Sequence, residues 1–116
     1  MEIDLKSICL DCKANSKNEA IQEVGWLLVE NGNILPEYIK SMHGREKVAN
    51  TYLGNGIAIP HGLQNDREFI KETGIAVVQI KAGVEWNPGE KVYLIFGIAA
   101  KSDEHIEILG NLTDLV

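Results

Sequence analysis

The 116-residue sequence is short of several residue types, and each shortage excludes a class of protein. It carries 17 acidic against 11 basic residues, for a net charge of −6, and only two arginines, Arg45 and Arg67. Nucleic-acid binding needs clustered basic side chains, so no nucleic-acid role is expected. The longest apolar run, residues 92–100, is far shorter than the about 20 residues of a membrane-spanning helix. The acidic start at Met1 lacks the basic-then-apolar pattern of a secretory signal. We therefore predict one cytoplasmic domain over residues 1–116.

Cysteine is scarce as well, with Cys9 and Cys12 in a Cys-Leu-Asp-Cys segment. A structural zinc site usually needs four ligands, and the three histidines are scattered, so no metal site is predicted. A redox pair is conceivable, but no helix begins directly after Cys9 to lower a thiol pKa. The favoured interpretation is two reduced structural thiols of a cytosolic protein.

The first part of the chain predicts a short strand and two helices. Residues 8–12 are a candidate strand, and Ser16 and Glu19 then have the spacing of a helix capping box. Apolar residues recur at helical spacing from position 20 until Asn31-Gly32, a left-handed helix stop. Pro36 suits the first position of a second helix, whose inner face would contain Ile39, Met42 and Val48.

The second part is typical of strands, with one last helix. A short apolar strand at 57–59 is ended by Pro60, which cannot donate to a sheet. Residues 73–80 predict another strand, Ala82-Gly83 a turn, and 84–86 a further short strand. The run 92–100 is apolar on both faces, as a central strand is. Ser102 or Asp103 would cap the last helix, which carries His105. We expect an α/β or α+β fold, with a mixed sheet covered by helices.

Three side chains could act together chemically: His61 after a strand end, His105 at a helix start, and Arg45 near a helix end. A neutral imidazole is a good nucleophile near pH 7 and can accept a phosphoryl group on a ring nitrogen. Arginine can bond two phosphate oxygens with its planar fork. The small residues near His61, including Gly62, would let a partner surface approach the ring.

Each of these features also has an ordinary structural explanation. A lone histidine such as His61 is more often a surface or core residue than a catalyst. Gly54-Asn55-Gly56 is a common turn signal. Arg45 and Glu46 could be a solvated helix end, and His43 a residue facing solvent.

A resemblance favours the chemical interpretation. Arg45-Glu46-Lys47 followed by the segment 51–62, Thr-Tyr-Leu-Gly-Asn-Gly-Ile-Ala-Ile-Pro-His-Gly, resembles a phosphorylation-site signature. This signature is typical of the enzyme IIA domains of the bacterial phosphoenolpyruvate-dependent sugar phosphotransferase system, in its mannitol and fructose class. A second block, Phe-Gly-Ile-Ala-Ala at 96–100 and then Glu104-His105-Ile106 and Leu109, agrees. Thr-Tyr-Leu-Gly together with Glu-His-Ile is most similar to the mannitol branch.

The resemblance implies a phosphotransferase. His61 would take a phosphoryl group from the histidine phosphocarrier protein HPr and pass it to a cysteine of an enzyme IIB domain, for uptake of a sugar alcohol, mannitol. His105 would be the second active-site histidine, and Arg45 the arginine near the phosphate. The family fold is a mixed sheet sandwiched between helices. No cofactor and no metal are implied, because the phosphoryl donor is a protein, and the domain would meet the membrane only through the permease.

The resemblance also implies a length difference and an alternative function. The family domain continues past the point where this chain stops, so a C-terminally shortened domain is expected. The alternative is a regulatory module of the nitrogen-linked branch, in which phosphorylation of the same histidine adds nearly two negative charges and switches contacts with other proteins.

Overall fold

The computed structural model describes residues 7–102, which form a five-stranded mixed sheet with the strand order β1-β4-β5-β3-β2. The strands are β1 (Ile8–Cys9), β2 (Tyr52–Gly54), β3 (Ile57–Ala58), β4 (Gly74–Asn87) and β5 (Glu90–Ala99). β4 and β5 are an antiparallel hairpin, whereas β1 pairs with β4 and β3 pairs with β5 in parallel. β5 is therefore the central strand, as its two-sided apolar pattern predicts.

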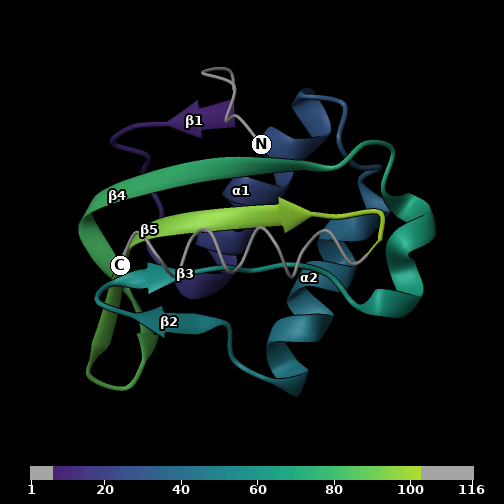
Figure 1. Cartoon of the computed structure of the whole chain (residues 1–116). Coiled ribbons are helices and arrows are strands. Elements are labelled where there is room, and N and C mark those ends of the chain that lie inside the picture. Colours follow the sequence, from purple (N-terminus) through teal and green to yellow (C-terminus); the bar gives the residue numbers. More distant parts are fainter. Residues whose placement is uncertain (1–6, 103–116) are drawn as a thin grey trace.

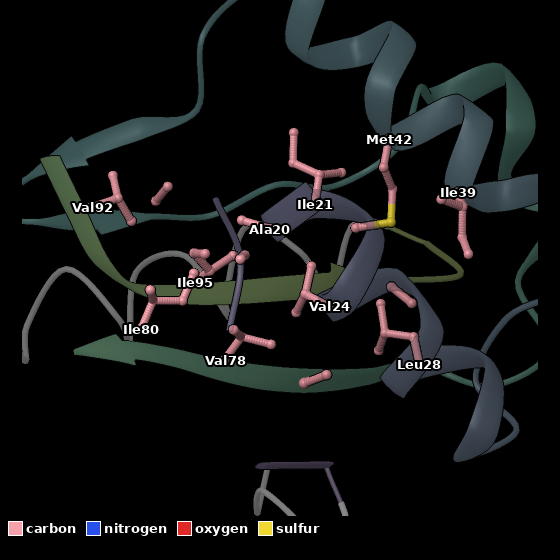
Figure 2. Close-up of a cluster of buried hydrophobic side chains, with 14 of the residues drawn as sticks. Ala20, Ile21, Val24, Leu28, Ile39, Met42, Val78, Ile80, Val92 and Ile95 are labelled. Carbon is pink, nitrogen blue, oxygen red and sulfur yellow. The ribbon is translucent and has the colours of Figure 1, made fainter. Parts of the chain in front are cut away.

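Two α-helices, α1 (Lys17–Glu30) and α2 (Glu37–Val48), lie together on one face of the sheet (Figure 1). A short 3₁₀ helix, η2 (Gln64–Phe69), occupies the polar segment between β3 and β4. The main core forms where α1 and α2 meet the hairpin, and Figure 2 shows Val24 and Leu28 of α1 in the same cluster as Val78 of β4 and Ile95 of β5. The mixed sheet with covering helices confirms the predicted fold class.

The start of α1 has the predicted Ser16 cap, but the Glu19 side chain bonds a different backbone N–H from the one a capping box uses. The Ser16 hydroxyl accepts a hydrogen bond from the Glu19 backbone N–H at 3.1 Å, as a capping box requires. The Glu19 carboxylate accepts from the Asn15 backbone N–H at 2.6 Å, one residue before the expected position. The helix ends at Glu30, and Gly32 has a φ of +77°. Both predicted ends of this helix are confirmed.

The predicted inner face of α2 is correct at two positions and wrong at the third. Ile39 and Met42 are buried, but Val48 is 74% exposed. Successive residues are about 100° apart around a helix, so the row through 39 and 42 continues to Glu46, whereas Val48 lies on the opposite side. A glutamate thus occupies a buried position on this helix.

The predicted turn at Ala82-Gly83 is also wrong, because β4 runs through it without a break from Gly74 to Asn87. The register against β5 shifts between Gln79 and Val84, and Gly83 has a φ of +76°. Glycine at a positive φ is typical of a β-bulge, which bends a strand without ending it. The chain reverses later, between Asn87 and Glu90.

The cysteines are not reduced thiols: the structure joins Cys9 to Cys12 in a disulfide, with their Cα atoms 5.8 Å apart. β1 ends at Cys9, and Asp11 adopts a left-handed φ of 55°, which returns the chain toward β1. The Cys12 backbone N–H donates to the Gln79 carbonyl at 2.7 Å and fixes this turn on β4. This turn therefore brings the two sulfur atoms together, contrary to the interpretation of two reduced structural thiols.

The opposite face of the sheet carries a second apolar cluster, which includes Ile59, Ile75, Val77 and Ile98. The predicted last helix, with His105, lies outside the described residues. Among residues 7–102, no helix is both long and apolar enough to span a membrane.

Candidate functional site

A cavity of about 220 Å³ opens where β3, β5, α2 and η2 meet. Its polar lining comes from three elements: Tyr38 and Arg45 from α2, His61 from the segment after β3, and Gln64 and Arg67 from η2. A histidine and two guanidinium groups therefore face one space.

The sheet fixes the backbone on the β3 side of this cavity. β3 ends at Ala58, one residue before the predicted strand end, and pairing with β5 resumes beyond Pro60. The Ile98 backbone N–H donates to the Pro60 carbonyl at 3.0 Å, and His61 forms an isolated parallel bridge with Ile98. Proline lacks only the N–H, so its carbonyl still accepts. His61 is thus held just beyond the end of β3 by its pairing with the central strand β5.

The His61 ring is oriented by its own backbone. Nδ1 lies 2.9 Å from the Ile59 carbonyl oxygen, and the ring is half-buried. A carbonyl only accepts hydrogen bonds, so Nδ1 carries the hydrogen. In the neutral ring the lone pair then belongs to Nε2.

The residues after His61 are held by hydroxyl groups of α2. The Gly62 backbone N–H donates to the Tyr38 hydroxyl at 2.9 Å, and the Leu63 N–H donates to the Ser41 hydroxyl at 2.7 Å. A Cβ atom on Gly62 would lie 2.4 Å from two ring carbons of Tyr38. The prediction that Gly62 leaves room for a partner is therefore wrong: Gly62 is buried and lets the tyrosine ring pack on the backbone.

Tyr38 is buried, and this burial raises the pKa of its hydroxyl above the ordinary value. The bond from Gly62 and the positive charge of Arg67 act in the lowering direction, and the charge of Asp66 raises the pKa further. The hydroxyl therefore remains protonated at neutral pH. It accepts from Gly62 while keeping its own hydrogen.

Arg45 lies near the end of α2, one turn beyond Ser41. Its Nη1 donates to the Ala49 carbonyl at 2.5 Å, which fastens the side chain to the last turn of its own helix. This bond uses one of five guanidinium donors. Arg45 is also one of the residues that line the cavity.

The neighbouring Glu46 is not a solvated residue, although a solvated helix end was one interpretation of the sequence. Its carboxylate accepts from the Thr51 N–H at 2.9 Å, the Thr51 hydroxyl at 2.5 Å and the Trp86 indole N–H at 2.9 Å. Lys17 completes the group, with Nζ 3.2 Å from Oε1. Glu46 therefore joins α2 to α1, to the approach to β2 and to β4.

Of the three predicted site residues, the structure brings His61 and Arg45 to one cavity, and His105 lies outside the described residues. Sequence reasoning missed Tyr38 and Arg67. For Arg67 a signal was available, because it is one of only two arginines in the sequence.

The family model for the phosphoenolpyruvate-dependent sugar phosphotransferase system, EIIA 2, matches residues 2–116. The chain belongs to this family. This EIIA domain is 58% identical over 103 residues to the multiphosphoryl transfer protein of Rhodobacter capsulatus, and the matched segment covers 89% of this chain and 12% of that protein. It is 43% identical over 107 residues to the mannitol-specific phosphotransferase enzyme IIA component of Geobacillus stearothermophilus, covering 92% and 74% of the two chains. It thus spans a small fraction of the first relative and most of the second.

Solved structures agree with the family. The EIIA domain matches the crystal structure of IIA mannitol from Escherichia coli with a TM-score of 0.92 and 37% identity, over 98% of this chain and 82% of that chain. A complex of enzyme IIAMTL with phosphorylated enzyme IIBMTL from the same organism matches with a TM-score of 0.92 and 36% identity, over 97% and 80%. The nitrogen regulatory protein IIA-Ntr from Neisseria meningitidis gives 0.79 and 30%, over 95% and 77%.

Proposed function

We propose that this EIIA domain is a phosphocarrier of the mannitol branch, in which His61 accepts a phosphoryl group from HPr and passes it to a cysteine of an enzyme IIB domain. The IIB domain then phosphorylates mannitol during uptake. The observation that carries this proposal is the hydrogen bond from His61 Nδ1 to Ile59, in a cavity that also contains Arg45. That bond supports Nε2 as the nucleophile.

The transfer keeps atoms and charge in balance. The Nε2 lone pair forms a bond to phosphorus as the phosphorus–nitrogen bond of phosphorylated HPr breaks. The hydrogen on Nδ1 stays in place, so the ring of His61 becomes positively charged next to the Ile59 carbonyl, which stabilises that charge. In the second step a thiolate sulfur of IIB attacks phosphorus, the bond to Nε2 breaks, and its electrons return the ring to the neutral state.

Arg45 would neutralise the charge that spreads over the phosphoryl oxygens in both steps, since phosphoryl transfer depends on positioning and electrostatic stabilisation. We assign His105 a similar supporting role, as a second hydrogen-bond donor to the same oxygens. Neither role needs a metal or a nucleotide, because the phosphoryl group arrives on a protein.

The partners and the location follow from this role. The similarity to IIAMTL, solved in complex with phosphorylated IIBMTL, supports an enzyme IIB partner. HPr is the donor that the family resemblance implies. We place the domain in the cytoplasm, at the membrane only through the permease, with residues 1–116 acting as one EIIA unit.

The regulatory alternative has weaker support. The IIA-Ntr structure matches at 30% identity and a TM-score of 0.79, against 37% and 0.92 for IIA mannitol. A carrier must donate to a mannitol-type IIB domain, whereas a regulator need not, so donation distinguishes the two functions.

The test is to mix the domain with phosphoenolpyruvate, enzyme I and HPr and to measure its intact mass before and after acid. We expect an acid-labile gain of one phosphoryl group, and its loss when a mannitol-type IIB domain is added. His61→Ala should abolish the gain, because the nucleophile is gone, and His105→Ala should slow it.

His43→Ala is the matched control, since His43 lies on α2 but does not line the cavity and hydrogen-bonds Gln22 at 3.2 Å. It should label at the wild-type rate. Full labelling of a folded His61→Ala variant would refute the assignment of the nucleophile, and a labelled domain that IIB cannot discharge would favour the regulatory alternative.

A further inference from the structure

The two arginines of this acidic chain, Arg45 and Arg67, line the same cavity as His61. They are 22 positions apart in the sequence, and different elements deliver them, α2 and η2. The net charge of the chain is −6, so two guanidinium groups in one cavity are a local reversal of its overall charge. An anion of the size of a phosphoryl group would be attracted to this place.

Arg67 reaches the cavity from η2, a short helix that is kinked next to it. The helix is kinked at Asp66, which has φ −104° and ψ 16°, and Asp66 is not among the residues that line the cavity. The Arg67 carbonyl accepts the Ile70 N–H at 3.0 Å, which closes the final turn of η2. Arg67 therefore lines the cavity, whereas the adjacent Asp66 does not.

Arg67 also acts on the group that holds the residue after His61. After burial, which raises the pKa of the Tyr38 hydroxyl, and the Gly62 bond, which lowers it, the charge of Arg67 lowers this pKa and the charge of Asp66 raises it. That hydroxyl accepts the Gly62 N–H at 2.9 Å. The guanidinium is thus within electrostatic range of the backbone next to the histidine.

We propose that Arg67 is a second phosphoryl-binding residue, which together with Arg45 holds the phosphoryl group carried by His61. The inference rests on the proposed phosphocarrier function and adds a residue to it. A phosphoryl group on Nε2 has three peripheral oxygens, and one guanidinium fork can bond two of them. A second fork supplies donors to the remaining oxygen and neutralises the second negative charge. The pair would favour the phosphorylated state of the domain in its exchange with HPr.

The first experiment measures the equilibrium constant for phosphoryl exchange between HPr and the domain, from intact masses. Arg67→Ala should shift it toward phosphorylated HPr by about tenfold or more, the effect of one charge-assisted hydrogen bond. Arg67→Lys retains the charge without the fork and should recover only part of the loss. Lys71→Ala removes a positive charge four residues further on, outside the cavity, and should leave the constant unchanged.

The second experiment uses inorganic phosphate as a probe on the unphosphorylated domain, with binding followed by the NMR signals of the His61 ring. Phosphate should bind the wild type and Lys71→Ala equally, and Arg67→Ala at least several-fold more weakly. This readout needs no partner protein, and thermal unfolding verifies that each variant is folded.

The outcomes separate the inference from the proposed function. If the wild type is phosphorylated and a folded Arg67→Ala variant keeps the wild-type equilibrium constant and phosphate affinity, Arg67 is not a phosphoryl ligand, and the function of His61 stands. If HPr does not phosphorylate the wild type, the phosphocarrier proposal fails, and phosphate binding alone decides the role of Arg67. Weaker phosphate binding by Arg67→Ala would then support an anion site at Arg67, and an unchanged phosphate affinity would overturn it. An equal loss in Lys71→Ala would reduce the effect to long-range charge and would also overturn the inference.

Discussion

Replacing Glu46 by alanine should destabilise the domain more than any other change of a single charged residue in residues 7–102. The substitution removes the acceptor for the Thr51 N–H, the Thr51 hydroxyl and the Trp86 indole N–H. Thr51 and Trp86 are each only 5% exposed, so water cannot easily replace the carboxylate. Leaving buried donors unpaired costs about 1–3 kcal/mol for each group, and breaking a buried charged pair costs about 3–5 kcal/mol.

We therefore expect Glu46→Ala to lower the free energy of unfolding by about 3–5 kcal/mol, or the Tm by about 10–20 °C. Glu46→Gln keeps an acceptor oxygen and should lie between alanine and the wild type. Lys17→Met is the matched control, because the Lys17 side chain is 25% exposed and its pair with Glu46 leaves the other three hydrogen bonds intact. Lys17→Met leaves the buried carboxylate without its cation but keeps its three hydrogen bonds, so its cost in free energy of unfolding should be smaller than that of Glu46→Ala.

Urea unfolding followed by the fluorescence of Trp86 is the assay, in a Trp26→Phe background that leaves one indole. Trp86 reports directly, since its N–H is bonded to Glu46. A loss of less than about 1 kcal/mol for Glu46→Ala, or equal losses for Glu46→Ala and Lys17→Met, would refute the view that this carboxylate joins four parts of the fold.

Three further predictions concern the helix α2 and the residues it contacts. Gly62→Ala should lower the free energy of unfolding by about 1–3 kcal/mol and slow phosphorylation, because the new Cβ would overlap the Tyr38 ring. Gly44→Ala is the control, since a Cβ there would have only one atom within 4 Å, at 3.7 Å, and it should leave stability unchanged or raise it. Burial, and then a neighbouring lysine, lower the pKa of His43 below its ordinary value of about 6.5. The unfolded chain then binds more protons than the folded one, so stability should be retained above about pH 6.5 and lost as the pH falls through the lowered pKa; His43→Gln should flatten this pH dependence in urea titrations. Arg45→Lys keeps the charge but loses the fork and should slow phosphoryl transfer in rapid-quench measurements, and equal rates would show that bidentate contact is not needed.

Much of the fold follows from local signals in the sequence. The Ser16 cap, the start of α2 after Pro36 and the two-sided apolar run of β5 each depend on residues within a few positions of one another. Such signals are visible in a sequence because the physical cause is local as well. They predict where elements begin and end, and which strand is central.

The features that were missed depend on contacts between distant segments. Ala82-Gly83 has the composition of a turn, but pairing with β5 on both sides makes it a bulge. Glu46 is buried because Trp86, 40 positions away, supplies a donor. Arg67 enters the site only because η2 lies against the cavity, and a polar segment gives no periodic signal for a short 3₁₀ helix.

The two hydroxyl bonds from α2 have a mechanical consequence. The Tyr38 and Ser41 hydroxyls accept consecutive backbone N–H groups from the histidine segment, and the same helix carries Arg45 one turn further on. When α2 shifts as a rigid rod, the segment after His61 and the guanidinium travel with it, so thermal motion of the helix changes their mutual spacing little. The amide hydrogens of Gly62 and Leu63 should accordingly exchange with solvent at the pace at which α2 detaches, slowly for a segment outside regular secondary structure.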